Sequence, residues 1–134
     1  MKISTVSRPR IHFTKNHEWI DFNGTVGFVG VSAFRLSGVG RIDGIRWCKP
    51  AGVIEKGTLV AEIFADDMIL PVCAPVKCRF LGRNQHLGNG LNLILESPQD
   101  KGWLFFIAPS VFGKQNDMLL TPEDYQKLIR AKTF

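Results

Sequence analysis

A disulfide framework, metal-ligand spacings and long apolar runs are all missing from this sequence. Its three cysteines are an odd number without framework spacing, which indicates reduced thiols in a reducing compartment. The three histidines are scattered, so neither the paired short spacings nor the fourth ligand of a zinc site is present. We therefore expect no metal site, and the cytoplasm is the expected location.

The sequence predicts no membrane segment. Its longest apolar runs fall far short of the roughly 18 residues that a spanning helix needs. The start, MKISTVSRPR, has no apolar signal core, although its basic and serine-containing character also fits a short organelle-targeting arm. We expect residues 1–10 to form a flexible arm and residues 11–134 a single domain, because 134 residues can bury one sizeable core but not two.

Acidic residues are outnumbered by basic ones, 12 to 17, which gives a net charge of +5. This excess makes nucleic acid or another acidic ligand a possible partner. The basic residues are spread from Lys2 to Lys132, however, and the nearest to a cluster is the set Lys77, Arg79 and Arg83. A generally solvated basic surface is therefore the preferred interpretation, with nucleic-acid binding as an alternative.

The central stretch, residues 57–76, predicts a β-hairpin with a charged tip. Two apolar runs, residues 58–65 and 68–72, meet at the acidic pair Asp66 and Asp67. Apolar side chains also crowd beside this tip on both strand faces, more than a hairpin with one buried face needs. These side chains are Phe64, Met68, Ile69 and Leu70. We expect one face to enter the core and the other to be a contact surface.

Turn and helix signals complete the outline. Asn23-Gly24, between residues 20–22 and 26–31, is a strong short hairpin signal. Near the end, Thr121 is an N-cap candidate followed by proline, and three later apolar residues share one helical face. Residues 86–90 have the composition of a loop. These signals therefore predict strands through most of the chain and a helix at its C-terminal end.

Three stretches suggest catalysis, and each has a simpler interpretation. The adjacent pair His17 and Glu18 would point to opposite faces of a strand, so anchoring through neighbours such as Trp19 is preferred. Paired carboxylates perform acid–base work only when burial or a partner distinguishes them, and at a hairpin tip solvated turn residues are the preferred interpretation. In residues 38–44 the third glycine is one position late for a dinucleotide loop, so Gly40 and Gly44 are interpreted as turn residues. We therefore expect that this protein is not an enzyme.

Several motifs together resemble the H-protein family of the glycine cleavage system. Residues 13–19, FTKNHEW, follow the family's entry motif, and residues 102–110, GWLFFIAPS, match its Gly-Trp-Leu…Pro-Ser strand. Lys56-Gly57 and Ala74-Pro75-Val76 frame the hairpin as in that family, and the resemblance extends from about Ile11 to Leu128. It implies an all-β fold, a barrel-sandwich hybrid of the lipoyl and biotinyl carrier (hammerhead) type, with short helices including a C-terminal one.

The resemblance also implies where a cofactor would be attached. In that family a lysine at the hairpin tip carries lipoate, and counting inward from either end of the hairpin places this position at Asp67. A carboxylate cannot form the lipoyl amide, and residues 57–76 contain no lysine. Lys56 and Lys77 are ten or eleven residues away, roughly 30 Å at about 3.3 Å per strand residue. We therefore expect no lipoate and no other cofactor.

Three functions follow from these observations. The preferred one is a non-lipoylated, non-catalytic binding module that docks on glycine cleavage or lipoate-handling enzymes. Its expected partner-binding tip consists of Phe64, Asp66, Asp67, Met68 and Ile69. The second is an aminomethyl carrier of the glycine cleavage system with an unusual attachment site. The third is a nucleic-acid or acidic-ligand binder on the same scaffold.

Overall fold

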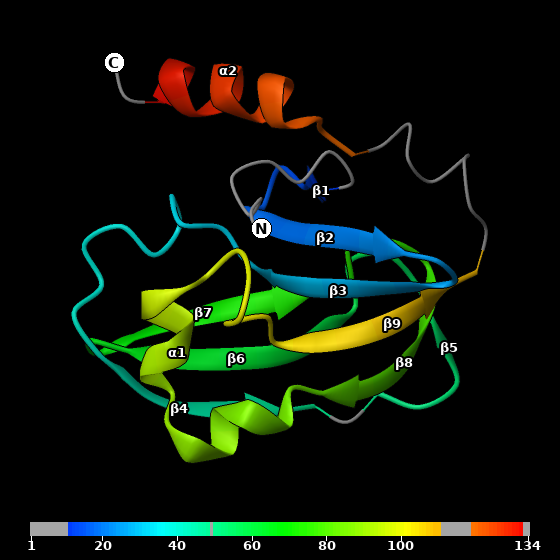
Figure 1. Cartoon of the computed structure of the whole chain (residues 1–134), viewed down its shortest axis with the longest axis horizontal. Helices are drawn as coiled ribbons and strands as arrows, with labels where there is room; N and C mark the ends of the chain where they lie inside the picture. The colour runs from blue at the N-terminus through cyan, green and yellow to red at the C-terminus, as the bar shows by residue number, and fades with distance from the viewer. Residues whose placement is uncertain (1–10, 49, 111–118, 133–134) are drawn as a thin grey trace, which may run out of the picture.

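The computed structural model describes residues 11–48, 50–110 and 119–132, and these residues form two antiparallel β-sheets (Figure 1). The larger sheet has six strands in the order β1-β2-β3-β9-β8-β5, and the smaller has three in the order β4-β6-β7. The bounds are β1 Ile11–Phe13, β2 Glu18–Asn23, β3 Val26–Val31, β4 Ile42–Trp47, β5 Val53–Ile54, β6 Leu59–Ala65, β7 Met68–Cys73, β8 Cys78–Arg83 and β9 Phe105–Pro109. The predicted all-β fold is confirmed. The two sheets pack together without closing into a barrel.

The core lies between the two sheets and follows from the alternation of side chains along each strand. Ile20 and Val29 enter it from the larger sheet, and Ile63 and Val72 enter it from the smaller one; all four are fully buried. Burying a side chain of this size contributes roughly 1.5–3 kcal/mol. The faces of β6 and β7 that point into this core fix the register of the hairpin, because a slip by one residue would expose them.

The hairpin predicted around Asn23-Gly24 joins β2 to β3, and the predicted strand 26–31 is confirmed. Its loop is Gly24-Thr25, one residue later than the sequence signal, and Asn23 pairs with Val26 in the ladder. Gly24 has a φ of 67°, a conformation that glycine adopts without steric cost.

The predicted C-terminal helix is also confirmed, as α2 (Pro122–Lys132), which lies across β1 in Figure 1. Thr121 caps it, since its Oγ1 accepts a hydrogen bond from the Asp124 N–H at 3.1 Å. The Tyr125 ring stacks on Phe13 with 4.1 Å between ring centroids. A second, smaller core of aromatic and aliphatic side chains therefore covers this part of the larger sheet from outside.

Two short helical segments follow β8: the 3₁₀-helix η1 (Gln85–Asn89) and α1 (Asn92–Glu96). The prediction of a loop at residues 86–90 is corrected by η1, which begins where the Asn84 side chain accepts a hydrogen bond from the His86 N–H at 2.9 Å. No helix in the described ranges is long and apolar enough to span a membrane. The expected flexible arm, residues 1–10, lies outside the described residues.

Candidate functional site at the hairpin tip

The tip between β6 and β7 is a tight two-residue loop. Ala65 pairs with Met68 across it, so only Asp66 and Asp67 lie outside the ladder. Their φ angles are 49° and 67°. Two consecutive positive φ angles define the type I′ turn, whose twist matches the twist of the flanking strands. Aspartate tolerates the left-handed region better than most residues, which explains why this pair can occupy the turn.

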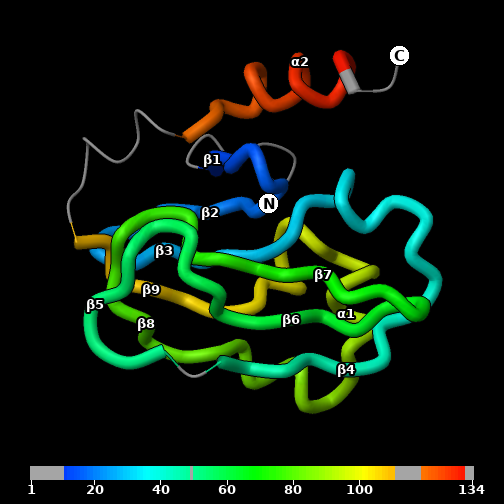
Figure 2. The backbone as a smooth tube through the Cα atoms, turned by 180° about the vertical axis from the view of Figure 1, so that it is seen from behind, coloured from blue at the N-terminus to red at the C-terminus, as the bar shows by residue number. Residues whose placement is uncertain are grey.

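The two tip aspartates have different surroundings. Asp66 is half-buried, and its Oδ2 accepts a hydrogen bond from the backbone N–H of Gly40 at 2.6 Å. This bond ties the tip to the segment between β3 and β4, which runs past the tip in Figures 1 and 2. Asp67 is exposed and, within the described chain, makes no hydrogen bond or ion pair. One carboxylate therefore supports the tip, and the other is presented to solvent.

Apolar side chains flank the carboxylates on the outside of the small sheet. Met68 is 47% exposed and Ile69 is 55% exposed. Ile69 pairs with the half-buried Phe64 across the ladder. Leu70, the next residue along β7, is buried in the core. The prediction that one face of this hairpin is buried while the other stays outside is confirmed.

The two lysines that frame the hairpin lie at its opposite end. There the Gly57 N–H donates to the Ala74 carbonyl and the Ala74 N–H donates to the Thr58 carbonyl, both at 2.8 Å. The seven residues of β6 separate this base from the tip, roughly 23 Å at about 3.3 Å per residue. Lys77 Nζ lies 3.7 Å from Glu55 Oε2, and both side chains are exposed. Neither framing lysine can take the place of a residue at position 67.

His17 and Glu18 turn away from each other, as expected, although the reason differs from the predicted one. His17 is not in a strand: it precedes β2 with a φ of 72°, and its Nδ1 lies 2.7 Å from the Tyr125 hydroxyl. Glu18 is buried, and its two carboxylate oxygens accept hydrogen bonds from Thr14 Oγ1 and the Cys73 N–H, each at 2.8 Å. The pair shares no reaction site, and each residue anchors a different part of the fold.

The Glu18 side chain joins the two sheets and protects the outer edge of β7. Burial raises the pKa of this carboxyl, while hydrogen bonds from Cys73 and Thr14 act in the opposite direction. Residue 71 on β7 is a proline, which has no N–H, and the N–H of Cys73 is bound to Glu18. Few donors therefore remain on this edge for pairing with another strand.

The cysteines show no catalytic or metal-binding arrangement among the described residues. Cys48, Cys73 and Cys78 are all free thiols, and no described group of three His, Cys, Asp or Glu residues could hold a metal ion. Burial raises the pKa of Cys78 to about 12. This thiol is therefore protonated and unreactive at neutral pH.

The predicted basic cluster does not form one continuous surface. Lys77 is next to Glu55, and the Arg83 guanidinium lies over the Trp47 ring at 5.6 Å from its centroid. Among the described residues, Arg79 has neither an acidic partner, as Lys77 has, nor an aromatic ring beneath its guanidinium, as Arg83 has. The arrangement favours a solvated basic surface over a track for a nucleic-acid backbone.

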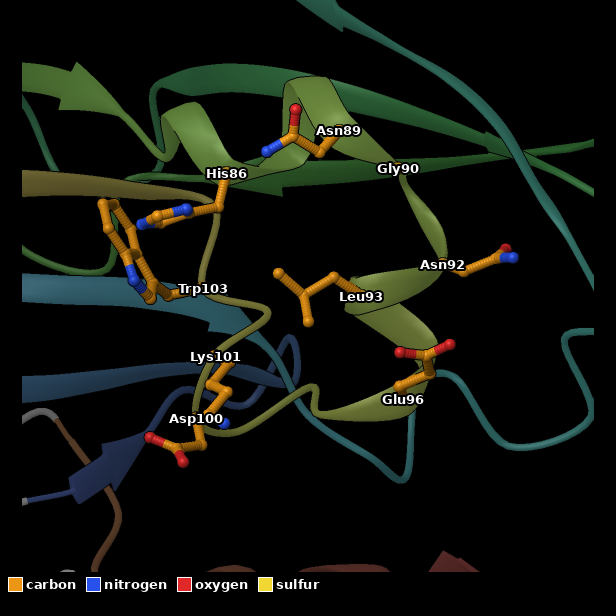
Figure 3. A pocket seen from close by; sticks show the side chains of 9 residues that line it. All are labelled: His86, Asn89, Gly90, Asn92, Leu93, Glu96, Asp100, Lys101 and Trp103. Atoms are coloured by element: carbon orange, nitrogen blue, oxygen red, sulfur yellow. The ribbon is translucent and has the colours of Figure 1, made fainter.

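A second candidate site is an open groove of about 810 Å³ beside η1 and α1. Figure 3 shows Leu93 pointing into the groove with His86 and Trp103 on the opposite side, whereas Asn92 points away from it. The lining also includes the charged residues Glu96, Asp100 and Lys101. No hydrogen bond joins a nucleophile to a base among these described residues, so the groove suggests no reaction. The hairpin tip remains the better candidate.

The sequence alone identifies the tip residues but not their support. It indicates only a turn at Gly40, whose N–H holds Asp66 in the structure. Residues 38–44 are rich in glycine, which is a signal for close backbone approach, but no local pattern indicates what approaches. The same is true of the Glu18 bond to Cys73, since these residues are 55 positions apart.

Two packed sheets and a hairpin that presents a two-residue tip define a β domain of the lipoyl type. The sequence model of the glycine cleavage H-protein matches residues 11–132, and the chain belongs to this family. It is 28% identical over 122 residues to the glycine cleavage system H protein of Carboxydothermus hydrogenoformans, covering 91% of this chain and 93% of that protein. It is also 28% identical over 120 residues to that of Thermus thermophilus, covering 90% and 93%.

Among solved structures, the fold is similar to a glycine cleavage system H protein from Mycobacterium marinum. The TM-score is 0.76 at 20% sequence identity, and the match covers 91% of this chain and 98% of that one. The fold of the family is therefore present almost in full. Membership of the family also confirms the prediction that the chain is not an enzyme, and indicates that its partners include proteins.

Proposed function

We propose that residues 11–134 act as one domain, a non-lipoylated member of the H-protein family that binds other proteins through its hairpin tip. The observation that carries this proposal is Asp67, the exposed carboxylate at the tip of a hairpin that otherwise resembles the family's. Lipoate attachment needs an amine nucleophile, which a carboxylate does not provide. The chain is therefore proposed to carry no lipoate.

The proposed binding surface consists of Phe64, Asp66, Asp67, Met68 and Ile69. Its apolar members provide desolvated contact area, and the exposed carboxylate provides orientation toward a basic group of the partner. The Gly40 bond to Asp66 fixes the loop before binding. A preformed tip loses less conformational entropy on docking than a flexible one, which favours affinity.

The proposed partners are glycine cleavage or lipoate-handling enzymes. Relatives with the same fold are named as H proteins of the glycine cleavage system, so enzymes that recognise those proteins already fit this shape. The three free thiols agree with a reducing compartment, and the cytoplasm is the proposed location.

The first test is the intact mass of the protein isolated from its own cells. We expect the mass of the unmodified chain, because no lysine lies at the tip. A mass increase that matches a lipoyl group, mapped to any lysine, would contradict the proposal. It would instead support an aminomethyl carrier with an unusual attachment site, the alternative that family membership favours.

Docking is tested with purified glycine cleavage and lipoate-handling enzymes of the same host. Ile69→Ser removes an exposed apolar side chain from the tip, and Leu81→Ser removes one from β8 as the matched control. We expect Ile69→Ser to weaken binding about tenfold, which corresponds to about 1.4 kcal/mol, and Leu81→Ser to leave it unchanged. Equal binding by all three proteins, or binding by none, would reject the proposed tip.

A further inference from the structure

Large apolar side chains that are well exposed occur at four positions in the described chain, and they form two pairs. Met68 and Ile69 belong to the hairpin tip. Val53 is 51% exposed on β5, and Leu81 is 41% exposed on β8. Val53 pairs with Arg79. Leu81 follows two residues further along β8, where the register of the ladder with β9 shifts between Phe80 and Gly82. We call Val53, Arg79 and Leu81 the end patch.

The two apolar pairs have opposite electrostatic surroundings. The tip pair adjoins the carboxylates of Asp66 and Asp67, whereas the end patch contains the guanidinium of Arg79. Arg79 is exposed and has no ion pair among the described residues. The four neighbouring strands β3, β9, β8 and β5 contain no aspartate or glutamate. Glu55, which directly follows β5, is exposed, and its charge is offset by Lys77 at 3.7 Å. The tip is thus acidic and apolar, and the end patch is basic and apolar.

The tip and the end patch lie at opposite ends of the molecule. Figure 1 places β5 at one end of the long axis and the joined ends of β6 and β7 at the other, and Figure 2 shows the same from behind. The two surfaces therefore cannot meet within one chain. They can meet only between two chains that are arranged head to tail.

We propose that copies of this chain associate head to tail, with the acidic tip of one copy docked on the basic end patch of the next. Asp67 faces Arg79 in this contact, and the exposed side chains of Met68 and Ile69 cover Val53 and Leu81. A tip-to-tip contact would bring carboxylates together, and a patch-to-patch contact would bring two Arg79 side chains together, so charge favours the head-to-tail arrangement.

This contact is heterologous, since it joins two different surfaces, and it leaves a free tip and a free end patch on every assembly. Such contacts grow into open chains rather than closed dimers. The contact is small, so we expect a dissociation constant of roughly 10⁻⁵ to 10⁻³ M. Because it uses the tip, an enzyme bound there would compete with it.

Sedimentation velocity over a concentration series tests the proposal. We expect the average sedimentation coefficient of the wild-type chain to rise with concentration, and to rise less at high salt, because screening weakens exposed charge pairs. Asp67→Arg and Arg79→Glu should each weaken association about tenfold. Arginine is chosen at position 67 because, unlike lysine, it cannot accept lipoate.

The double variant Asp67→Arg/Arg79→Glu provides the decisive comparison. It restores an opposite pair with reversed sign, so it should associate more strongly than either single variant. Lys127→Glu, an exposed charge reversal on α2, is the matched control and should behave as wild type. Circular dichroism of each variant confirms that it is folded. Association unaffected by the single variants, or a double variant no stronger than they are, would overturn the proposal.

Amide chemical shifts give an independent readout. Raising the concentration should shift residues of the tip and of the end patch together. Shifts at one surface only would indicate a symmetric contact and would also overturn head-to-tail association. The outcome is separate from that of enzyme docking, because loss of enzyme binding leaves the self-association of the purified chain measurable.

Discussion

The backbone at Asp67 has a φ of 67°, in the left-handed region that costs most residues about 1–2 kcal/mol. Aspartate tolerates this region better than most residues, but glycine removes the cost altogether. Glycine would therefore be more stable than aspartate at this exposed position.

Asp67→Gly should therefore stabilise the fold while it removes the tip charge. The resulting Asp-Gly pair is the preferred sequence of a type I′ turn. We expect the free energy of unfolding to rise by about 0.5–1 kcal/mol in chemical denaturation. Asp43→Gly, in the extended strand β4, is the contrast, and it should lower stability. A loss of stability in Asp67→Gly would contradict the type I′ assignment.

Glu18 makes stability depend on pH in a defined direction. Burial raises the pKa of its carboxyl in the folded chain above the ordinary value of 4.5. Its protonated form is thus favoured by folding, and the associated stabilisation is complete below about pH 4.5 and is lost as pH rises through the raised pKa. Glu18→Gln cannot titrate, so the stability of wild type relative to Glu18→Gln should increase from pH 7 to pH 4.

Urea denaturation at several pH values measures this difference. Glu123→Gln, on the exposed start of α2, corrects for the removal of one carboxyl from the chain. A difference between wild type and Glu18→Gln that is constant with pH, or that changes in the opposite direction, would show that Glu18 is held as a carboxylate by Thr14 and Cys73 rather than destabilised by burial.

At the scale of elements, local patterns predict most strands, and tertiary contacts decide the rest. Strand 26–31 is predicted in full, and the predicted runs 58–65 and 68–72 differ from β6 and β7 by one residue at one end. Residues 85–96 are not predicted as helical, because η1 and α1 are too short for periodicity to be detected.

The candidate site, too, is predicted from the sequence only in part. Its two-residue loop and exposed apolar residues follow from sequence alternation. The Gly40 support and the Glu18 bridge depend on residues far apart in the chain, at separations of 26 and 55 positions. A single sequence contains no periodic signal for such contacts, so they could not be predicted from it.

The chain at Gly102 packs against α1 so closely that there is no room for a side chain. A Cβ atom at this position would lie 2.6 Å from the Leu93 carbonyl oxygen and 2.7 Å from that of Ser97. Both neighbours are backbone atoms, so they cannot move aside without shifting α1. We expect Gly102→Ala to lower the free energy of unfolding by about 1–3 kcal/mol in chemical denaturation.

The matched control for Gly102→Ala is Gly88→Ala in η1. A Cβ at Gly88 would meet no atom within 4 Å, and its φ is not positive. Its stability should change by less than about 0.5 kcal/mol. Equal stability of the two variants would mean that the loop before β9 adapts to the added methyl group.

At the scale of the whole molecule, one core between the two sheets is lined by residues of both, so we expect the two sheets to unfold together. Cys78 lies in this core, is 0% exposed, and starts the strand that joins β5 to β9. Its thiol can meet a reagent only when the core opens. Cys48 and Cys73 are half-buried nearer the surface and do not need that opening.

The alkylation rate of Cys78 should therefore report global unfolding. When closing is faster than alkylation, the rate follows the population of the open state, so a loss of about 2 kcal/mol in Gly102→Ala should accelerate it roughly 30-fold. Gly88→Ala should not change it. Mass spectrometry resolves the three thiols, and Cys48 and Cys73 should react at the same rates in both variants. If Cys78 instead reacted as fast as Cys48 in the wild-type chain, its alkylation would not require global unfolding. The two sheets would then open separately, and the larger sheet would not support the hairpin that carries the tip.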